Sequence, residues 1–443
     1  MSTLSSALTV CDTLRRHGFM ALFAGGCVRD RLLGRSPKDY DVATNATPEE
    51  VRALFPRIVP VGLSFGVVKV LQDGEEIDVV TFRRDGAYQD GRHPDSVAYA
   101  APREDAMRRD FTINALFLDP ATDQVLDFTG GLEDLRNQVI RCVGNPRERF
   151  LEDRLRLLRA IRFASALNFR IVPETWDALK QVTAEEGLQG VSAERIREEL
   201  DRMLTEGGAR RAMEALSESG LLSLILPEIA DLKGVPQPEA FHPEGDVWEH
   251  TLRMLDLLPP HAPVELAWAA LLHDCGKPRT ITYADRIRFH YHEKVGEQMV
   301  HGIGRRLRFP NRRIERIAWL VGNHMRLAAF PDMREGKRKR FSREPDFPLL
   351  VELGRLDSLA SHGDTSVIEW IRQYLSHEPP AQPLPPPLIT GDDLKALGLP
   401  PGPAYRELLQ MLHERQIEGV FSTREAGLAL ARKLIEARQP PDE

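Results

Sequence analysis

The chain has 443 residues, of which 42% are hydrophobic and 28% are charged, a composition typical of a globular protein with several domains. No apolar run reaches the ~18 residues of a membrane-spanning helix, and the start of the chain lacks a secretory pattern, so we expect a cytoplasmic protein without a membrane partner. The formal net charge of −7 gives no general indication of nucleic-acid binding, and the four cysteines have no paired spacing, which argues against disulfides or a zinc site.

The chain begins with an amphipathic helical pattern over residues 5–17 and a short buried strand over residues 20–24. A glycine pair and an aspartate pair follow. Gly26 would let the backbone approach a phosphate at the start of a helix that carries Arg29. Asp39 and Asp41 would project from one face of an extended strand.

Two carboxylates held this close repel each other unless a cation lies between them, and hard oxygen ligands suit Mg²⁺. An Asp-x-Asp pair alone is also common in solvated turns. The glycine pair and Arg29 at this spacing favour a site for a metal and a triphosphate.

The next elements are a helix and a hairpin. Thr47, a following proline and Glu50 predict a capped helix start. Two strand-like runs, 66–72 and 75–82, meet at an Asp-Gly turn. Asp78 on the second run is a candidate third carboxylate beside Asp39 and Asp41, and an edge-strand acid is an equal alternative.

Residues 83–96 form a polar loop that is longer than most connections, so we expect it to be functional or disordered. A basic segment with Arg109 follows, and it leads through Asp110 to an apolar run that contains Asn114. This arrangement suits binding of a triphosphate and a ribose, although a charged helix face would look similar.

Beyond residue 146 the strand patterns stop. Residues 136–170 contain nine arginines and no lysine, and residues 151–167 form a strong helical pattern. One face of that pattern bears the residues Asp153, Arg156, Arg159 and Arg162. Spacing by three places them in one slowly turning ribbon, and a single acid followed by three arginines favours an anionic ligand over a solvated face.

The ribbon also suggests how a base could be selected. A carboxylate accepts from an exocyclic amine and a guanidinium donates to a ring nitrogen, the pattern that cytosine and adenine present. Asp153 with Arg156 would therefore accept CTP and ATP. The same pair would reject UTP and GTP, because unpaired buried polar groups are costly.

Further helical patterns lead to a short linker at residues 235–238 and then to a second group of polar residues. Its members, all metal-binding residue types, are His250, His273, Asp274, His292, His324 and Asp357. An adjacent His-Asp pair at the end of an apolar helix needs polar partners. Imidazole and carboxylate together suit a divalent transition metal; His250, His273, Asp274 and Asp357 would form a mononuclear site, which His292 and His324 could extend to a two-metal phosphohydrolase site.

Near the C-terminus, serines and prolines in residues 376–387 predict a stiff extended linker. Two glycine-proline turns and two amphipathic helices follow, up to about residue 438. The simplest interpretation of their leucines is a hydrophobic core.

Taken together, these motifs resemble those of bacterial tRNA nucleotidyltransferases (CCA-adding enzymes) and bacterial poly(A) polymerases of class II. The resemblance rests on Gly-Gly-Cys-Val-Arg-Asp with Asp-Tyr-Asp, on Arg-Arg-Asp-Phe-Thr-Ile-Asn at residues 108–114, and on Glu-Asp-Arg-Leu-Arg at residues 152–156. It implies an α+β head with a polymerase-β-like nucleotidyltransferase sheet, followed by all-α neck, body, HD and tail domains.

The resemblance also implies residue roles. Asp39 and Asp41 match the Mg²⁺-binding catalytic pair, to which we add Asp78. The matching nucleotide-binding residues are Gly26, Arg29, Arg109, Asp110, Asn114, Asp153, Arg156, Arg159 and Arg162. The segment 241–365 resembles the HD phosphohydrolase domain, with His250, His273, Asp274 and Asp357 on its defining motif.

We therefore expect a head at residues 1–145, a helical neck and body at 146–235, an HD domain at 241–365, a proline-rich linker at 366–388 and a tRNA-binding tail at 389–443. The expected activity is addition of CCA to tRNA from CTP and ATP, without an evident obligate protein partner. The HD site could act on phosphorylated RNA ends. The alternatives are an enzyme that adds only A, a poly(A) polymerase, an antibiotic-modifying type of nucleotidyltransferase, and an HD-only or RNA-binding protein with an inactive head.

Overall fold

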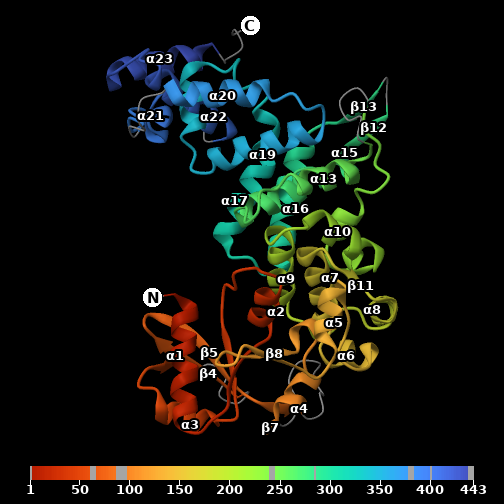
Figure 1. Ribbon diagram of the computed structural model, residues 1–443. Helices are drawn as coiled ribbons and strands as arrows, with labels where there is room; N and C mark the ends of the chain where they lie inside the picture. Colours follow the sequence, from red (N-terminus) through yellow and green to blue (C-terminus); the bar gives the residue numbers. More distant parts are fainter. Residues whose placement is uncertain are drawn as a thin grey trace. The chain divides into compact units, whose positions relative to one another are not determined.

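The structure is a computed structural model that describes residues 2–59, 66–85, 97–238, 245–283, 286–377, 384–399 and 402–437 (Figure 1). The chain forms two compact units. The first contains Met1–Ala230, Pro259–Val264 and Gly304–Phe309, and the second contains Asp231–Leu258, Glu265–Ile303 and Pro310–Glu443. Among the described residues, no helix combines the length and the hydrophobicity needed to cross a bilayer.

The head is built on a seven-stranded sheet with the strand order β3-β4-β5-β2-β1-β8-β9. The strands are β1 (Ala21–Ala24), β2 (Asp41–Thr44), β3 (Ile58–Val59), β4 (Val67–Gln72), β5 (Glu75–Thr81), β8 (Leu116–Asp119) and β9 (Gln124–Asp127). β2 and β5 are parallel, and every other neighbouring pair is antiparallel. The sheet confirms the predicted strands and the predicted hairpin, whose turn residues Asp73 and Gly74 both have positive φ.

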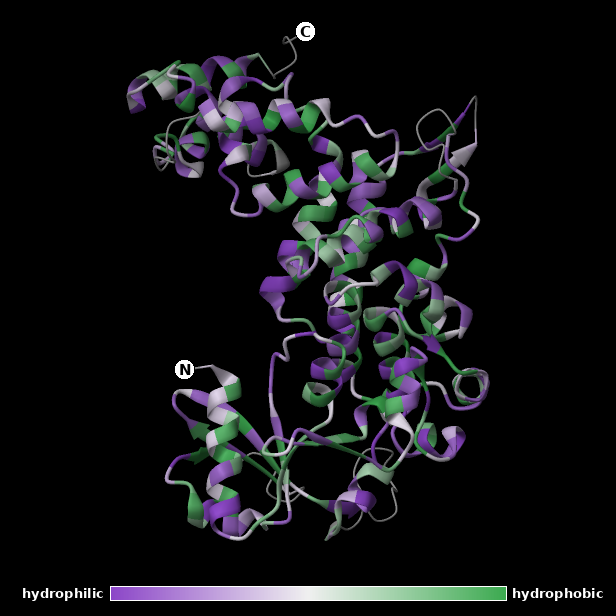
Figure 2. Cartoon of the chain, viewed as in Figure 1, coloured by the Kyte–Doolittle hydropathy of each residue, from purple (hydrophilic) through white to green (hydrophobic). Residues whose placement is uncertain are grey.

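Apolar and charged residues alternate along the strands, so the two faces of this sheet differ in character. Val68, Val70, Ile77 and Val79 are buried against helix α1 (Thr3–Arg16), together with its own apolar residues. Their sequence neighbours Lys69 and Asp78 therefore point to the opposite face. Figure 2 shows the hydrophobic strands of this sheet in green. The α1 face forms the core, and the opposite face is free to carry charged groups.

Short helices surround the sheet. They are α2 (Gly26–Leu32), α3 (Pro48–Leu54), α4 (Pro102–Met107), the 3₁₀ helix η2 (Thr112–Asn114) and α5 (Gly131–Arg136). A separate two-stranded sheet pairs β6 (Arg83–Asp85) with β7 (Val97–Tyr99). The α3 helix has the predicted capping box between Thr47 and Glu50.

The rest of the first unit is largely helical, as predicted. Its helices are α6 (Pro146–Glu152), α7 (Leu155–Leu167), α8 (Pro173–Glu185), α9 (Ala193–Thr205), α10 (Ala209–Glu218), α11 (Leu221–Ile225) and α12 (Pro227–Ala230). One short parallel pairing, β10 (Val139–Ile140) with β11 (Arg170–Ile171), was not anticipated.

The predicted single helix over residues 151–167 is wrong at its start. Asp153 has φ −145°, which ends α6, and α7 begins two residues later. The Asp153 carboxylate accepts a hydrogen bond from the backbone N–H of Leu155 at 3.0 Å. Aspartate competes for backbone donors in this way, so it favours a helix boundary over a helix interior.

The second unit is helical around one short hairpin. Its elements are α13 (Val247–Asp256), α14 (Val264–Leu272), α15 (Lys277–Thr280), β12 (Ile281–Tyr283), β13 (Ile287–Phe289), α16 (His292–Arg306), α17 (Asn311–Asn323), η3 (His324–Arg326), α18 (Glu335–Ser342), α19 (Phe347–Ala360) and α20 (Ser366–His377). Trp268 and the apolar residues around it on α14 are fully buried. Asp246 caps α13, as its position before the predicted helix suggests.

The predicted linker over residues 366–388 is wrong in its first half. Residues 366–377 form α20, and Ile368 and Ile371 on this helix are buried. The prolines that would stop a helix begin only at Pro379. Residues 378–383 lie outside the described residues. The tail consists of α21 (Gly391–Ala396), α22 (Pro403–Ile417) and α23 (Arg424–Glu436), whose leucines form the predicted core.

Candidate functional site

A cavity of about 1000 Å³ in the first unit is lined by every head and neck residue predicted for a site. These residues are Gly26, Arg29, Asp39, Asp41, Asp78, Arg109, Asp110, Asn114, Asp153, Arg156, Arg159 and Arg162. They come from strands, loops and helices up to 136 residues apart in sequence, and folding brings them to the wall of one cavity.

The carboxylates lie on the sheet face opposite α1. Asp41 at the start of β2 pairs in register with Asp78 on β5, and Asp39 lies two residues before Asp41. Burial raises the pKa of Asp41 to about 6, and the charges of Asp78 and Asp39 add to the effect, while Arg109 opposes it. Lys69, the cross-strand neighbour of Asp78, places its Nζ 3.0 Å from Asp78 Oδ1.

This carboxylate group fits a divalent cation. The raised pKa of Asp41 means that its own surroundings do not supply enough positive charge for the ionised form. Asp39, Asp41 and Asp78 all offer hard oxygen ligands to the cavity. A bound dication would supply the missing charge, and these three residues are the ones that would hold it.

The glycine pair lies beside Asp41, because a Cβ added at Gly25 would lie 3.9 Å from Asp41 Oδ2. Gly25 has φ +74°, and a Cβ added there would lie 2.9 Å from Arg109 Nη1, so a side chain would displace the arginine. Arg29 donates from Nη1 to Asn114 Oδ1 at 2.7 Å, and its guanidinium lies 5.2 Å from the ring centroid of Phe163. Gly25 therefore leaves room for the Arg109 side chain at the cavity wall.

Asp110 connects the head to helix α7. Its Oδ1 accepts from the backbone N–H of Phe111 at 2.8 Å and from Asn114 Nδ2 at 3.2 Å. Its Oδ2 accepts from Arg159 Nη2 at 2.5 Å and Nε at 2.8 Å. Burial would raise the pKa of Asp110, but the Arg159 guanidinium and these hydrogen bonds lower it to about 2. Asp110 is thus a fixed anion that joins two segments of the cavity wall.

The arginine ribbon is neutralised by acids from other segments, although its sequence pattern of one acid and three arginines favours an anionic ligand. Arg156 lies 2.7 Å from Glu152, in the preceding helix α6. On the adjacent helix α9, Glu199 lies 2.5 Å from Arg162, and Arg195 lies 2.7 Å from Asp153. The pattern of charges along one helix could not predict these partners, because the acids lie on other segments that contact the helix.

Sequence reasoning missed several residues that line or support this cavity. Arg195 clamps Asp153 with two hydrogen bonds, at 2.7 and 3.3 Å. The Phe163 ring lies under Arg162 at 4.1 Å and under Arg159 at 5.2 Å. Strand alternation could have indicated Lys69, which faces the same side as Asp78, whereas the pairing of α7 with α9 has no local signal.

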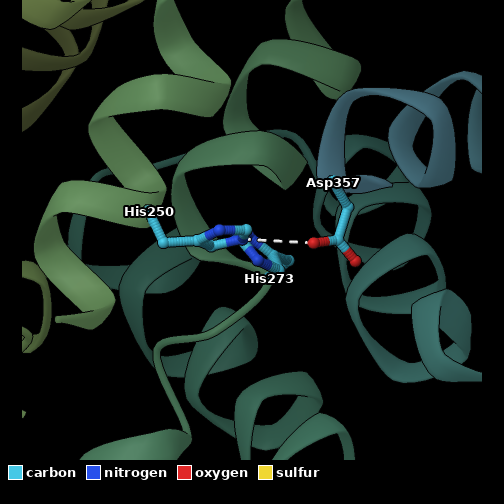
Figure 3. A group of neighbouring side chains, drawn as sticks. All are labelled: His250, His273 and Asp357. Carbon is cyan, nitrogen blue, oxygen red and sulfur yellow. Dashed lines mark ion pairs between the residues drawn. The ribbon is translucent and has the colours of Figure 1, made fainter. Parts of the chain in front are cut away.

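A second site lies in the second unit, where the six predicted histidines and aspartates come together. Their side chains form two triads, His250 with His273 and Asp357, and Asp274 with His292 and His324. In each triad the possible ligand atoms lie within 4.8 Å of one another. Figure 3 shows the rings of His250, from α13, and of His273 beside the Asp357 carboxylate of α19; His250 Nε2 is 3.1 Å from Asp357 Oδ1.

Backbone contacts orient the histidines as metal ligands. The Nδ1 atoms of His273, His292 and His324 lie 3.0, 2.9 and 2.7 Å from the carbonyl oxygens of Ala270, Phe289 and Val321. If each Nδ1 donates its proton there, each Nε2 presents a lone pair, the arrangement common to metal-binding histidines. His292 Nε2 and His324 Nε2 then face each other at 3.2 Å.

The second site also fits divalent metal. His273 Nε2 lies 3.1 Å from Asp274 Oδ2 without the geometry of a hydrogen bond, so two potential metal-ligand atoms converge in a buried place. Burial would raise the pKa of Asp274, but the His273 ring and the Lys277 ammonium, 2.6 Å from Oδ2, lower it well below its usual value. Burial and the neighbouring rings of His273 and His292 lower the pKa of His324 to about 3.

Two further residues at this site were missed. Gly276, next to the His-Asp pair, packs so closely on α16 that a Cβ would lie 2.2 Å from the carbonyl oxygen of His292. Lys277 donates to Gln237 Oε1 at 2.6 Å, and its ammonium lies 5.3 Å from the Phe289 ring. Lys277 has a sequence signal, its position three residues after Asp274, whereas Gln237 lies in the segment predicted to be a linker.

Three family descriptions match successive parts of the chain. Residues 21–141 match the "Poly A polymerase head domain", and residues 168–233 match the "Probable RNA and SrmB- binding site of polymerase A". Residues 247–359 match the HD domain. The first match contains the sheet with its carboxylates, and the third contains both histidine triads.

Similar proteins include CCA-adding enzymes. That of Anoxybacillus flavithermus is 44% identical over 230 residues, which are 51% of this chain and 56% of the relative. That of Geobacillus stearothermophilus is 43% identical over 225 residues, 51% of this chain and 55% of the relative. The matched segments thus span little more than half the length of these relatives.

Solved structures resemble the whole chain. The CCA-adding enzyme of Bacillus stearothermophilus in complex with CTP is 27% identical, with a TM-score of 0.68 and coverage of 99% of both chains. The Thermotoga maritima CCA-adding enzyme complexed with tRNA has a TM-score of 0.56 over 98% of this chain and 95% of that chain. At 21% identity, the second likeness supports the fold alone.

Replacing Asp110 by asparagine should destabilise the protein in a pH-dependent way. The pKa of Asp110 falls from 3.8 to about 2 in the folded state. This shift corresponds to about 2 kcal/mol of stability, which is present above pH 4 and is lost as the pH falls towards 2. Urea unfolding followed by circular dichroism between pH 7 and pH 3 should show a gap between wild type and Asp110→Asn that narrows below pH 4.

The matched control is Asp12→Asn, which removes an exposed acid of α1 and should leave the unfolding midpoint unchanged. A gap for Asp110→Asn that stays constant across the pH range would contradict the ion pair with Arg159.

Proposed function

Because the chain belongs to the family of tRNA nucleotidyltransferases and bacterial poly(A) polymerases and carries an HD domain, we propose that it adds CCA to the 3′ end of tRNA, using CTP and ATP. The observation that carries the proposal is the single cavity that gathers carboxylates, phosphate-binding cations and the Asp153–Arg156 pair. Such a function places the protein in the cytoplasm.

In the proposed reaction, the tRNA 3′ oxygen forms a bond to the α-phosphorus of the nucleotide, and the bond to the departing pyrophosphate breaks. Mg²⁺ held by Asp39, Asp41 and Asp78 would supply charge stabilisation to this transfer. Arg29, beside Gly26, is positioned to bind the triphosphate. Its hydrogen bond to Asn114 fixes the guanidinium before the substrate arrives, which limits the ordering cost of binding.

Arg109 and Asp110 support the phosphate and ribose region. Arg109 donates to the carbonyl oxygen of Asn114 at 3.1 Å and pairs with Asp105 at 3.1 Å, so its position is set by two segments. Arg159 and Arg162 continue the wall toward α9. Because their charges are already paired, we infer that these two arginines shape the cavity more than they attract anions.

Base selection is assigned to Asp153 and Arg156, as the hydrogen-bonding pattern of cytosine and adenine requires. Arg195 and the Leu155 N–H hold the Asp153 carboxylate but leave capacity for a further donor, because two carboxylate oxygens offer about four lone-pair positions. Glu152 and the Arg149 carbonyl hold Arg156 in a similar way. Side chains held in this way can distinguish one base from another without a large change in their own conformation.

The alternatives within the family are addition of A alone and poly(A) synthesis. The family resemblance implies that enzymes adding only C lack a working version of the loop over residues 83–96, and residues 86–96 of this loop lie outside the described residues. The similarity to CCA-adding enzymes favours complete CCA addition. An inactive head is disfavoured because Asp39, Asp41 and Asp78 all line the cavity. The match to the RNA-binding region counts against a small-molecule nucleotidyltransferase.

Product length tests this proposal. Purified protein is incubated with tRNAs that end before, within and one nucleotide short of CCA, together with CTP, ATP or both. We expect complete CCA from the first substrate only when both nucleotides are present, and Asp41→Asn should lower incorporation by at least 1,000-fold while tRNA binding persists.

The control is Asp177→Asn, which changes an exposed acid of α8. This variant should retain wild-type incorporation. Long A tracts, or addition of A alone whatever the tRNA end, would favour the alternatives. Full incorporation by Asp41→Asn would refute the assignment of the cavity.

We further propose that the HD site hydrolyses phosphate esters at RNA ends, because a 3′ end blocked by a phosphate or a 2′,3′-cyclic phosphate cannot be extended. The observation in favour is the pair of triads, one of which contains His273 and the other the adjacent residue Asp274. In hydrolysis of a cyclic phosphate, a water oxygen binds phosphorus, one ester P–O bond breaks, and the departing ribose oxygen takes up a proton. A divalent transition metal would activate that water.

His273→Ala should lower the bound metal and the hydrolysis of a 2′,3′-cyclic phosphate at an RNA end by at least tenfold, because it removes a ligand from one triad. Metal content after dialysis against Mn²⁺ or Ni²⁺ and product chromatography measure the two effects. His301→Ala changes a histidine outside both triads and should behave as wild type. Metal-dependent hydrolysis that is unchanged in His273→Ala would refute the proposed HD site.

A further inference from the structure

The hairpin β12–β13 exposes tyrosine beside the HD site. Tyr283 is 71% exposed at the end of β12, and Tyr291 is 74% exposed directly before the metal-site residue His292. No function described above uses either ring. Tyrosine is enriched at binding surfaces, because it combines a large apolar ring with a polar hydroxyl group.

The hairpin is attached directly to the metal site through Phe289 on β13. The carbonyl oxygen of Phe289 lies 2.9 Å from His292 Nδ1. The Phe289 ring contacts His292 edge-on, with 6.5 Å between ring centroids, and the Lys277 ammonium lies 5.3 Å from the same ring. A molecule bound along the hairpin would therefore reach the HD centre at Phe289.

The strand register places Tyr283 on the same face as Phe289. Ile281 pairs with Phe289, and Tyr283 pairs with Ile287. These four side chains therefore lie on one face of the hairpin, and Thr282 and Arg288 lie on the other. Two residues along a strand span about 7 Å. The face thus extends the aromatic surface outward from the metal site by about the length of one nucleotide unit.

Tyr291 continues this surface at the start of α16. Its φ of +59° lies in the left-handed region, which bulky residues rarely adopt. The carbonyl oxygen of Tyr291 accepts the N–H groups of Lys294 and Val295 at 3.0 and 3.1 Å, so the unusual conformation is held by the helix start. The conformation turns the chain between Phe289 and His292, and it leaves the Tyr291 ring in solvent.

The charge around the hairpin is positive. The arginines Arg279, Arg286 and Arg288 lie at the hairpin with the acids Asp285 and Glu293, whereas Lys277 and Lys294 are paired with Asp274 and Glu297. Arg279 and Arg286 are exposed, and within the described ranges neither has an ion-pair partner. Asp285 lies outside the described residues. This local excess contrasts with the net charge of −7 of the whole chain.

We propose that the Tyr283 face of the β12–β13 hairpin and Tyr291 bind the end of a single-stranded nucleic acid and deliver its terminal phosphate to the HD centre. The inference rests on the proposed hydrolase function and names the substrate class of that site. Tyrosine rings stack on unpaired bases, and arginines attract the phosphate backbone, which is the usual combination in proteins that bind single strands. A small phosphate ester would need neither feature.

The test compares two substrates on the full-length protein with Mn²⁺. One is a single-stranded RNA that ends in a 2′,3′-cyclic phosphate, and the other is bis(p-nitrophenyl) phosphate, which has no base or backbone. Tyr283→Ala should lower kcat/KM for the RNA about tenfold, because one stacking contact is lost. It should change kcat/KM for the small ester less than twofold, and Tyr283→Phe should retain wild-type values.

The matched control is Tyr99→Ala, which removes a tyrosine of the head that is 55% exposed and should leave both hydrolysis rates unchanged. Equal losses on both substrates in Tyr283→Ala would mean that the residue supports the metal site and does not bind the nucleic acid. No loss on either substrate would refute the stacking contact.

A second measurement needs neither metal nor catalysis. RNA with 4-thiouridine at its 3′ end is irradiated with the protein in chelator, and the crosslinked peptides are identified by mass spectrometry. Crosslinks to residues 281–291 are expected, and their loss in Tyr283→Ala would support the proposal. Crosslinks confined to the head or the tail would overturn it. If the wild type hydrolyses neither substrate, the hydrolase function is wrong, and the crosslinks alone decide whether the hairpin binds nucleic acid.

Discussion

The ion pair between Asp110 and Arg159 is the interaction on which the cavity of the first unit depends. Asp110 follows the head helix α4, and Arg159 lies in the middle of α7, so the pair joins the head to the helix that carries Arg156, one of the two proposed base-reading residues. Asn114 extends the connection from Asp110 to Arg29. A buried carboxylate without this guanidinium would be costly, and the two walls of the cavity would lose their common anchor.

The same principle explains why the arginines of α7 do not form an open anion-binding surface. Glu152, Glu199 and Asp110 each neutralise one of them. Buried charges are generally paired, because transfer of an isolated charge from water is unfavourable. Paired arginines are held in fixed positions, and the proposed selection of bases by their hydrogen-bonding edges benefits more from fixed donors than from net charge.

Local sequence patterns predicted much of this structure. Alternation predicted β4 and β5 and the face of Asp78, the capping residues predicted the start of α3, and residue chemistry identified all members of both histidine triads. Long-range packing was not predictable. Nothing near Arg162 in sequence indicates Glu199, and Gln237 reaches Lys277 from a segment interpreted as a linker. The break before Leu155 was missed because the apolar pattern continues across Asp153, whose side chain ends one helix and helps to begin the next.

We propose that protein side chains, and no nucleic-acid template, select the incoming base through Asp153. The most direct measurement is the ratio of kcat/KM for CTP to that for UTP, in wild type and in Asp153→Asn, on a tRNA that lacks CCA. The amide keeps the shape of the side chain but can donate to the uracil carbonyl, so the account predicts that the ratio falls at least tenfold. A lower rate with an unchanged ratio would contradict it and would assign base selection elsewhere.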